Sequence, residues 1–341
     1  MIILFATIIF MACENSSVET EWPNLTLEAE DHILPGYFVT AMAFDSQGVA
    51  WIGTFAHGLI RYEQGMFSIY NQANFENAAD RIWDIAIDSH DNVWIGTDGL
   101  VKYDGVTFTR FDNSNTIMPE NFVHNVAVDY DDVVWLSASV FQQGGLMKYN
   151  GRDFELFTPA NSKAPENMVI DITVDHNNTK WVTFAKYVNE VSMVKINGNN
   201  WSLITEKEIG FQPYYWGALA VNTDNSLIAS IDYSLSSSMD NTRPSLIMYN
   251  NGTWTNISPV NDEGQSLGNV YSINCDQSGY VWVGLGMNPS GNQFAVFNGK
   301  KWFTGQENTV EGTIFAMATD ASNRTWLGTG NGVTIMRTFV K

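Results

Sequence analysis

The side chains best suited to acid–base chemistry in this sequence are two of its five histidines, His57 and His124. With a carboxylate such as Asp84, they could move protons in an elimination, because imidazole titrates near neutral pH. The sequence carries no H-x-x-x-H, C-x-x-C, G-x-S-x-G or phosphate-loop spacing. We therefore expect no metal and no cofactor, and a non-catalytic protein in preference to an enzyme. A lyase that uses His57 and His124 is the alternative.

A second group of residues combines aromatic rings with polar side chains, and these are our candidate ligand-binding residues. They are Trp83, Trp216, Tyr271, His124, Arg81, Tyr215, His57 and Asp84. Sugar rings have apolar CH faces and polar edges, which match aromatic faces flanked by hydrogen-bonding groups. We predict that a glycan or another small molecule binds here. The alternatives are that these aromatics pack between neighbouring repeats and that the protein is an interaction scaffold for an envelope protein partner.

The elements that must position these residues form an internal repeat. An Asp lies six residues before a Trp in six units, and a seventh unit has Asn222 and Ile228 at the same two positions. The units recur every 41 to 54 residues, which is the size of one four-stranded propeller blade. The six pairs are Asp45/Trp51, Asp88/Trp94, Asp129/Trp135, Asp175/Trp181, Asp276/Trp282 and Asp320/Trp326.

Each unit has the pattern of four strands. The alternation in 82–87 predicts a first strand, and the turn residues of 45–48 predict a tight connection. Trp51 to Thr54 and Gly58 to Tyr62 follow as second and third strands, and an aromatic pair such as Phe67/Tyr70 marks the outer strand. The Gly that follows the Trp pair predicts a close approach of neighbouring blades.

The seventh unit ends before it reaches its fourth strand, and the spacing of Trp22 and Leu25 matches the missing one. We therefore predict an all-β protein, a single seven-bladed β-propeller over residues 22–341, whose last blade is closed by the N-terminal strand. Closure would leave no long free strand edge.

The repeats differ most at the position five residues before each Asp. In the third and fourth repeats the residue that follows this position is polar, Asn125 and Asp171. Three long connections between second and third strands, 139–144, 185–191 and 232–244, fall on the same side of the ring. Function is therefore expected at a mouth on this side, rimmed by Trp83, His124, Trp216 and Tyr271. The residues at the variable position are Thr40, Trp83, His124, Ile170, Gly217, Tyr271 and Phe315.

The run from Asp88 to Tyr103 carries Asp, Trp-x-Gly-Thr and Gly-Leu-x-x-Tyr, and it resembles the two-component regulator propeller family. Members of this family are typically seven-bladed units in the periplasmic sensor regions of bacterial hybrid histidine kinases. This sequence has one propeller and no kinase pattern. The resemblance implies the fold, an extracytoplasmic setting and a recognition role. Streptogramin lyases are also propellers, which is the basis of the lyase alternative.

The first 12 residues are apolar and match the core of a secretory signal. Residues 10–13 resemble a bacterial lipobox, which predicts lipidation of Cys13 and a tether over 13–21. We expect a lipid-anchored protein of the bacterial cell envelope, periplasmic or at the surface, that meets the membrane only through Cys13. A plain cleaved signal is the alternative.

Charge excludes one class of partner. The 37 acidic and 17 basic residues give a net charge of −20, whereas nucleic-acid binding needs clustered Lys and Arg. We therefore predict that no nucleic acid binds.

Overall fold

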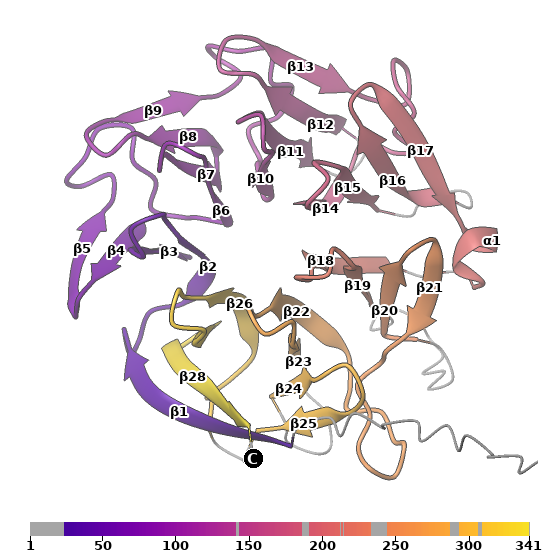
Figure 1. Cartoon of the computed structure of the whole chain (residues 1–341). Helices are drawn as coiled ribbons and strands as arrows, with labels where there is room; N and C mark the ends of the chain where they lie inside the picture. The colour runs from indigo at the N-terminus through magenta and orange to yellow at the C-terminus, as the bar shows by residue number, and fades with distance from the viewer. Residues whose placement is uncertain are drawn as a thin grey trace, which may run out of the picture.

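The computed structural model shows a ring of seven four-stranded antiparallel sheets around a central axis (Figure 1). It describes residues 24–140, 143–185, 191–211, 213, 215–232, 244–286, 293–305 and 309–340. The predicted fold class, an all-β seven-bladed propeller, is confirmed. Signal residues 1–12 and the tether with Cys13 lie outside the described residues.

The strands of each blade follow one another from the centre of the ring outward. Blades 1 to 3 contain β2 (Val39–Phe44), β3 (Ala50–Thr54), β4 (Leu59–Glu63) and β5 (Met66–Tyr70); β6 (Asp84–Ile87), β7 (Val93–Thr97), β8 (Gly99–Tyr103) and β9 (Phe108–Phe111); β10 (Val126–Val128), β11 (Val134–Val140), β12 (Gln143–Tyr149) and β13 (Phe154–Phe157).

Blades 4 to 6 repeat this order, and a one-turn helix, α1 (Glu206–Ile209), follows blade 4. Their strands are β14 (Val169–Val174), β15 (Lys180–Phe184), β16 (Val191–Asn197) and β17 (Asn200–Thr205); β18 (Tyr215–Val221), β19 (Leu227–Asp232), β20 (Leu246–Asn250) and β21 (Thr253–Asn256); β22 (Val270–Cys275), β23 (Val281–Leu285), β24 (Phe294–Phe297) and β25 (Trp302–Thr304). In the part of the chain that the structure describes, no helix has the length and apolar composition for a membrane crossing.

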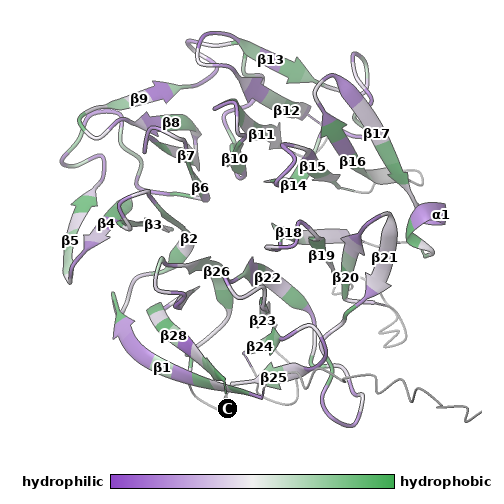
Figure 2. Cartoon of the chain, viewed as in Figure 1, coloured by the Kyte–Doolittle hydropathy of each residue, from purple (hydrophilic) through white to green (hydrophobic). Residues whose placement is uncertain are grey.

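Blade 7 uses both ends of the chain. β26 (Ile314–Thr319), β27 (Thr325–Thr329) and β28 (Gly332–Val340) come from the C-terminus, and β1 (Leu25–Ile33) is the outer strand. β1 pairs with β28 from Leu25 opposite Val340 to Ile33 opposite Val333. The middle side chains of β1, from Glu28 to His32, are exposed, and most of the strand is accordingly hydrophilic (purple in Figure 2). The predicted closure by the N-terminal strand is thus present, while Trp22 lies outside the described residues.

The Asp–Trp pair of each repeat is held by one hydrogen bond. In six blades the indole Nε1 donates to the carboxylate Oδ2 at 2.9 to 3.1 Å. In blade 1 the other oxygen, Asp45 Oδ1, accepts the amides of Gln47 and Val49, so a single side chain orders the turn and orients the indole. Blade 5 lacks the pair, and its Asn222 instead donates through Nδ2 to the Gly279 carbonyl in blade 6.

Close contact between blades explains the Gly in the second strands. A Cβ at Gly53 would lie 2.5 Å from Ile82 Cγ2, and one at Gly96 would lie 2.7 Å from the Val123 carbonyl oxygen. Both contacts are with the next blade. The predicted close approach is confirmed, and the apolar core consists of clusters between neighbouring sheets.

Candidate functional site

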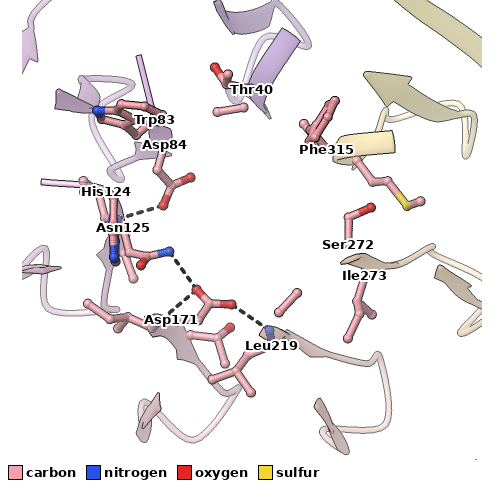
Figure 3. Close-up of a pocket in the computed structure, with 18 of the residues that line it drawn as sticks. Thr40, Trp83, Asp84, His124, Asn125, Asp171, Leu219, Ser272, Ile273 and Phe315 are labelled. Carbon is pink, nitrogen blue, oxygen red and sulfur yellow. Dashed lines mark hydrogen bonds between the residues drawn. The ribbon is translucent and has the colours of Figure 1, made fainter. Parts of the chain in front are cut away.

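A cavity of about 590 Å³ occupies the centre of the ring and runs along the inner strands (Figure 3). All seven residues at the variable position five before each Asp line it, as do Asp84, Asn125 and Asp171. Its volume falls within the range of small-molecule sites, roughly 300–1,000 Å³.

In four blades a β-bulge at the start of the inner strand turns the side chain at the variable position inward. The register between first and second strands skips one residue at Thr40, Ile170, Tyr271 and Phe315. A bulge inserts an extra residue and re-aims its side chain. The variable position therefore leaves the ladder and faces the cavity, whereas the preceding residue stays in the core.

One wall of the cavity carries a chain of polar side chains (Figure 3). Asp84 accepts the amide of Val126 at 2.8 Å, and Asp171 accepts the amide of Leu219 at 2.7 Å. Asn125 donates through Nδ2 to Asp171 Oδ1 at 3.1 Å, and its own Oδ1 is buried with no hydrogen-bond partner. Each carboxylate thus joins its blade to the next one and also borders the cavity.

Burial changes the protonation of this wall. It raises the pKa of Asp84 to about 7, although the amides of Val126 and Ile85 oppose the shift. It also raises the pKa of Asp171 to about 7, again against an amide, that of Leu219. Both carboxyls are therefore partly protonated at neutral pH, when each can donate as well as accept.

His124 and Trp83 stand beside this wall. Burial lowers the pKa of His124, and its Nδ1 is 3.0 Å from the Ser137 hydroxyl, so the ring is neutral at pH 7. The Nε1 of Trp83 is buried without a hydrogen-bond partner. A neutral imidazole at the cavity wall suits hydrogen bonding to an uncharged ligand.

Aromatic rings continue from the cavity across its rim. Phe315 contacts Phe38 with ring centroids 4.8 Å apart, Phe38 contacts Phe55 at 5.6 Å, and Phe55 contacts Trp83 at 5.7 Å. We call these four residues the aromatic arc. Tyr271 and Phe315 are 47% and 44% exposed, and Phe38 and Phe55 are each 38% exposed. The rim therefore presents apolar ring faces to solvent.

Phe38 and Phe55 are site residues that the sequence reasoning missed. Phe38 lies two residues before the variable position in blade 1, where the strand alternation again turns the side chain out of the core. Phe55 directly follows Trp51 to Thr54, the Trp-Ile-Gly-Thr run that recurs in blade 2. Reading these flanking positions in every repeat would have found both.

Four of the eight predicted residues line the cavity: Trp83, His124, Tyr271 and Asp84. Arg81 does not, but its guanidinium carbon lies 4.7 Å from the ring centroid of Phe55 and 5.7 Å from that of Trp83. It therefore borders the aromatic arc.

The other three are not among the lining residues. The predicted position of Trp216 at the rim is wrong: it is 4% exposed and packs with Trp181 in the core between blades 4 and 5. Its equivalents in other repeats, such as Ile82 and Val123, are also buried, which is the signal that the sequence offered. Tyr215 flanks Trp216 in β18, and the exposed ring of His57 contacts Tyr37 instead, so His57 and His124 do not share the cavity.

Two of the three long connections, 185–191 and 232–244, lie largely outside the described residues, which omit 186–190 and 233–243. In the third, 139–144, β11 runs to Val140 and β12 begins at Gln143, and only 141–142 are not described. Among the residues that are described, no three His, Cys, Asp or Glu side chains form a group suited to a metal ion. No ligand set for a metal centre is therefore available there.

Comparison with known proteins identifies the repeat. Residues 33–56 and 78–99 match the family model described as two component regulator propeller. The predicted resemblance is confirmed in blades 1 and 2. No curated protein matches the sequence.

Several solved structures share the fold. The extracellular domain of the hybrid two component system BT4673 from B. thetaiotaomicron aligns with a TM-score of 0.67 at 19% identity, covering 92% of this chain and 42% of that one. Virginiamycin B lyase from Staphylococcus aureus, an inactive variant with quinupristin, aligns with 0.68 at 10%, covering 92% and 99%. PorZ of Porphyromonas gingivalis, a surface component of the type-IX secretion system, aligns with 0.59 at 15%, covering 85% and 45%. At these identities the likeness concerns the fold, and this chain spans about two fifths of the BT4673 domain.

Proposed function

We propose that this chain, which resembles the two component regulator propellers, is a non-catalytic recognition protein of the bacterial cell envelope. It binds a glycan at the open end of the central cavity. The observation that carries the proposal is the cavity itself, where the seven positions that vary most between repeats come together around about 590 Å³.

The lining favours a sugar over a purely apolar ligand. The rings of Trp83, Tyr271 and Phe315 offer faces for CH groups. Asp84, Asn125 and Asp171 add polar side chains along the same wall, and these can exchange hydrogen bonds with ligand hydroxyls. A sugar ring supplies both kinds of contact.

Two alternatives receive less support. A scaffold without a ligand would fill its mouth with its own side chains, whereas the cavity here holds a wall of polar groups under half-exposed aromatic rings. A lyase using His57 and His124 needs both imidazoles in one cleft, and His57 is not among the cavity-lining residues.

An envelope location fits two observations. Residues 1–13 have the pattern of a signal followed by a lipidation site, and the BT4673 structure that shares the fold is an extracellular domain. We propose that Cys13 carries the anchor. In bacterial cells fed labelled palmitate, the full chain should incorporate label and Cys13→Ser should not; equal labelling of the two would contradict the anchor.

The binding site is tested with the mature chain and a panel of neutral and acidic polysaccharide fragments. At least one fragment should raise the melting temperature, and Trp83→Ala should remove that increase. Phe67→Ala is the matched control, because Phe67 is an exposed aromatic on outer strand β5, away from the cavity. No shift with any fragment, or equal loss in both variants, would refute the proposal.

A further inference from the structure

A second depression, of about 280 Å³, lies beside the central cavity. It is formed by the segment that enters β26 and by the turn between β27 and β28. Its lining residues are Glu311, Gly312, Thr313, Phe315, Gly330 and Asn331. Phe315 also lines the central cavity, so the two hollows are neighbours that share one aromatic side chain.

A stacked aromatic pair joins the two hollows. The rings of Phe315 and Phe38 lie 4.8 Å apart with an interplanar angle of 28°. Phe38 also lies against Gly330, where an added Cβ would be 3.6 Å from its ring. Both rings are about two fifths exposed. Together they form an apolar bridge from the cavity to the second depression.

The second depression has a polar far edge that is already ordered. Asn331 donates through Nδ2 to Glu311 Oε2 at 2.9 Å, and its Oδ1 accepts the Gly36 amide at 2.9 Å. The exposed Glu311 carboxylate is thereby held in place as an acceptor. A ligand that crosses the aromatic pair would meet a fixed acceptor, with little loss of side-chain entropy on binding.

The charge of the lining restricts what can bind. The residues that line the two hollows include three carboxyl groups, those of Asp84, Asp171 and Glu311, and no Lys or Arg. Asp84 and Asp171 are partly protonated at neutral pH, and Arg81 lies at Phe55, on the part of the aromatic arc away from the second depression. The like charge that an acidic chain would meet is therefore that of Glu311, and this contact is unfavourable. A chain of uncharged or amine-bearing sugars has no such penalty.

We propose, building on the proposed function, that the ligand is an extended glycan chain without acidic groups that occupies both hollows. The terminal disaccharide enters the central cavity, the next sugar packs its CH face on Phe315 and Phe38, and the chain continues to Glu311. The site therefore recognises a segment of a polymer instead of a single sugar.

The test compares chain lengths by calorimetry, with fragments of one to six sugars from neutral glucan, mannan, xylan and galactan and from acidic polygalacturonate and alginate. Neutral fragments of four or more sugars should bind at least about tenfold more tightly than the disaccharide of the same polymer. Phe38→Ala should remove this length advantage while leaving disaccharide affinity within about twofold. Gly330→Leu, which fills the second depression, should do the same, and Phe67→Ala should change neither affinity.

The outcomes separate the two proposals. If disaccharides and longer fragments bind equally, or if acidic fragments bind as tightly as neutral ones, the two-hollow inference is overturned and binding at the central cavity stands. If length dependence survives in both Phe38→Ala and Gly330→Leu, the inference is also overturned. If no fragment of any length binds, both proposals fall.

Discussion

Asp84 accepts a hydrogen bond from the backbone amide of Val126 at 2.8 Å, across the boundary between blade 2 and blade 3. Asp171 makes the same contact with Leu219 at 2.7 Å, between blades 4 and 5. Two carboxyls of the candidate site are therefore also structural links in the ring. Their protonation should couple the stability of the propeller to pH.

We expect Asp84→Asn to change the pH dependence of stability. The folded pKa of about 7 lies above the ordinary value of 3.8, so between these values the folded chain holds a proton that the unfolded chain releases. Wild-type stability should fall as pH rises from about 4 to about 7, and the amide variant should lose this contribution. One unit of pKa shift corresponds to ~1.4 kcal/mol, so the variant should gain at least that much relative to wild type across this range.

Urea unfolding at several pH values measures this difference. Glu76→Gln, which changes an exposed carboxyl, serves as the control and should follow wild type. A constant difference between Asp84→Asn and wild type from pH 4 to pH 7 would contradict the prediction.

Asp91 should stabilise the opposite face of the ring. Its two oxygens accept the amide and hydroxyl of Ser46 in blade 1 at 2.8 and 2.6 Å, and its φ is 60°. Asp91→Gly keeps this backbone conformation and removes both bonds, at an expected cost of about 1 kcal/mol. Asp91→Asn should lie between Asp91→Gly and wild type, because its one amide oxygen can still accept the Ser46 amide, as Asn178 in blade 4 accepts the amide of Tyr130.

The Asp91 contact should also depend on pH, in the opposite sense to Asp84. Hydrogen bonds from Ser46 lower the pKa of Asp91 below 3.8, so its contribution is present above that pH and is lost as pH falls below it. The difference between wild type and Asp91→Gly should therefore shrink in acid. A difference that is unchanged at pH 3 would show that the carboxylate charge is not involved.

Removal of residues 22–30 should lower the melting temperature sharply. This deletion removes most of β1 and exposes the edge of β28, which β1 covers from Leu25 to Ile33. Deletion of residues 14–21 leaves β1 intact and should have no effect. Differential scanning calorimetry of both truncated chains decides the matter, and equal melting temperatures would refute the role of β1 in closure.

Trp216→Ala should mainly reduce the folding free energy, whereas Trp83→Ala should mainly alter ligand binding. Trp216 is buried in the core between blades 4 and 5, so truncation should cost about 3–5 kcal/mol of folding free energy. Trp83 is half-buried beside the cavity, so its truncation should cost about 1–2 kcal/mol and mainly alter ligand binding. Chemical denaturation together with fragment binding separates the two effects, and a larger stability loss for Trp83→Ala would overturn this assignment.

Much of the candidate site could be predicted because the repeat identifies equivalent positions. Once Asp88 and Asp129 are aligned, Trp83 and His124 occupy the same place in consecutive blades, and both line the cavity. The same alignment places Trp216 with the buried Ile82. Aromatic character and an irregular local sequence therefore suggested exposure for Trp216 where the repeat position indicated burial.

The sequence by itself determined the ring of seven blades and its closure. Alternation, turn residues and the Asp–Trp pair act within one blade, over a few residues, so their physical consequences can be read locally. Only the tertiary structure decided which side chains meet at the centre. Phe38 and Phe315 are far apart in the chain and stack because blades 7 and 1 become neighbours when the ring closes. The bulges and the twist of each sheet then set where their rings lie, and these depend on packing between blades that no single repeat contains.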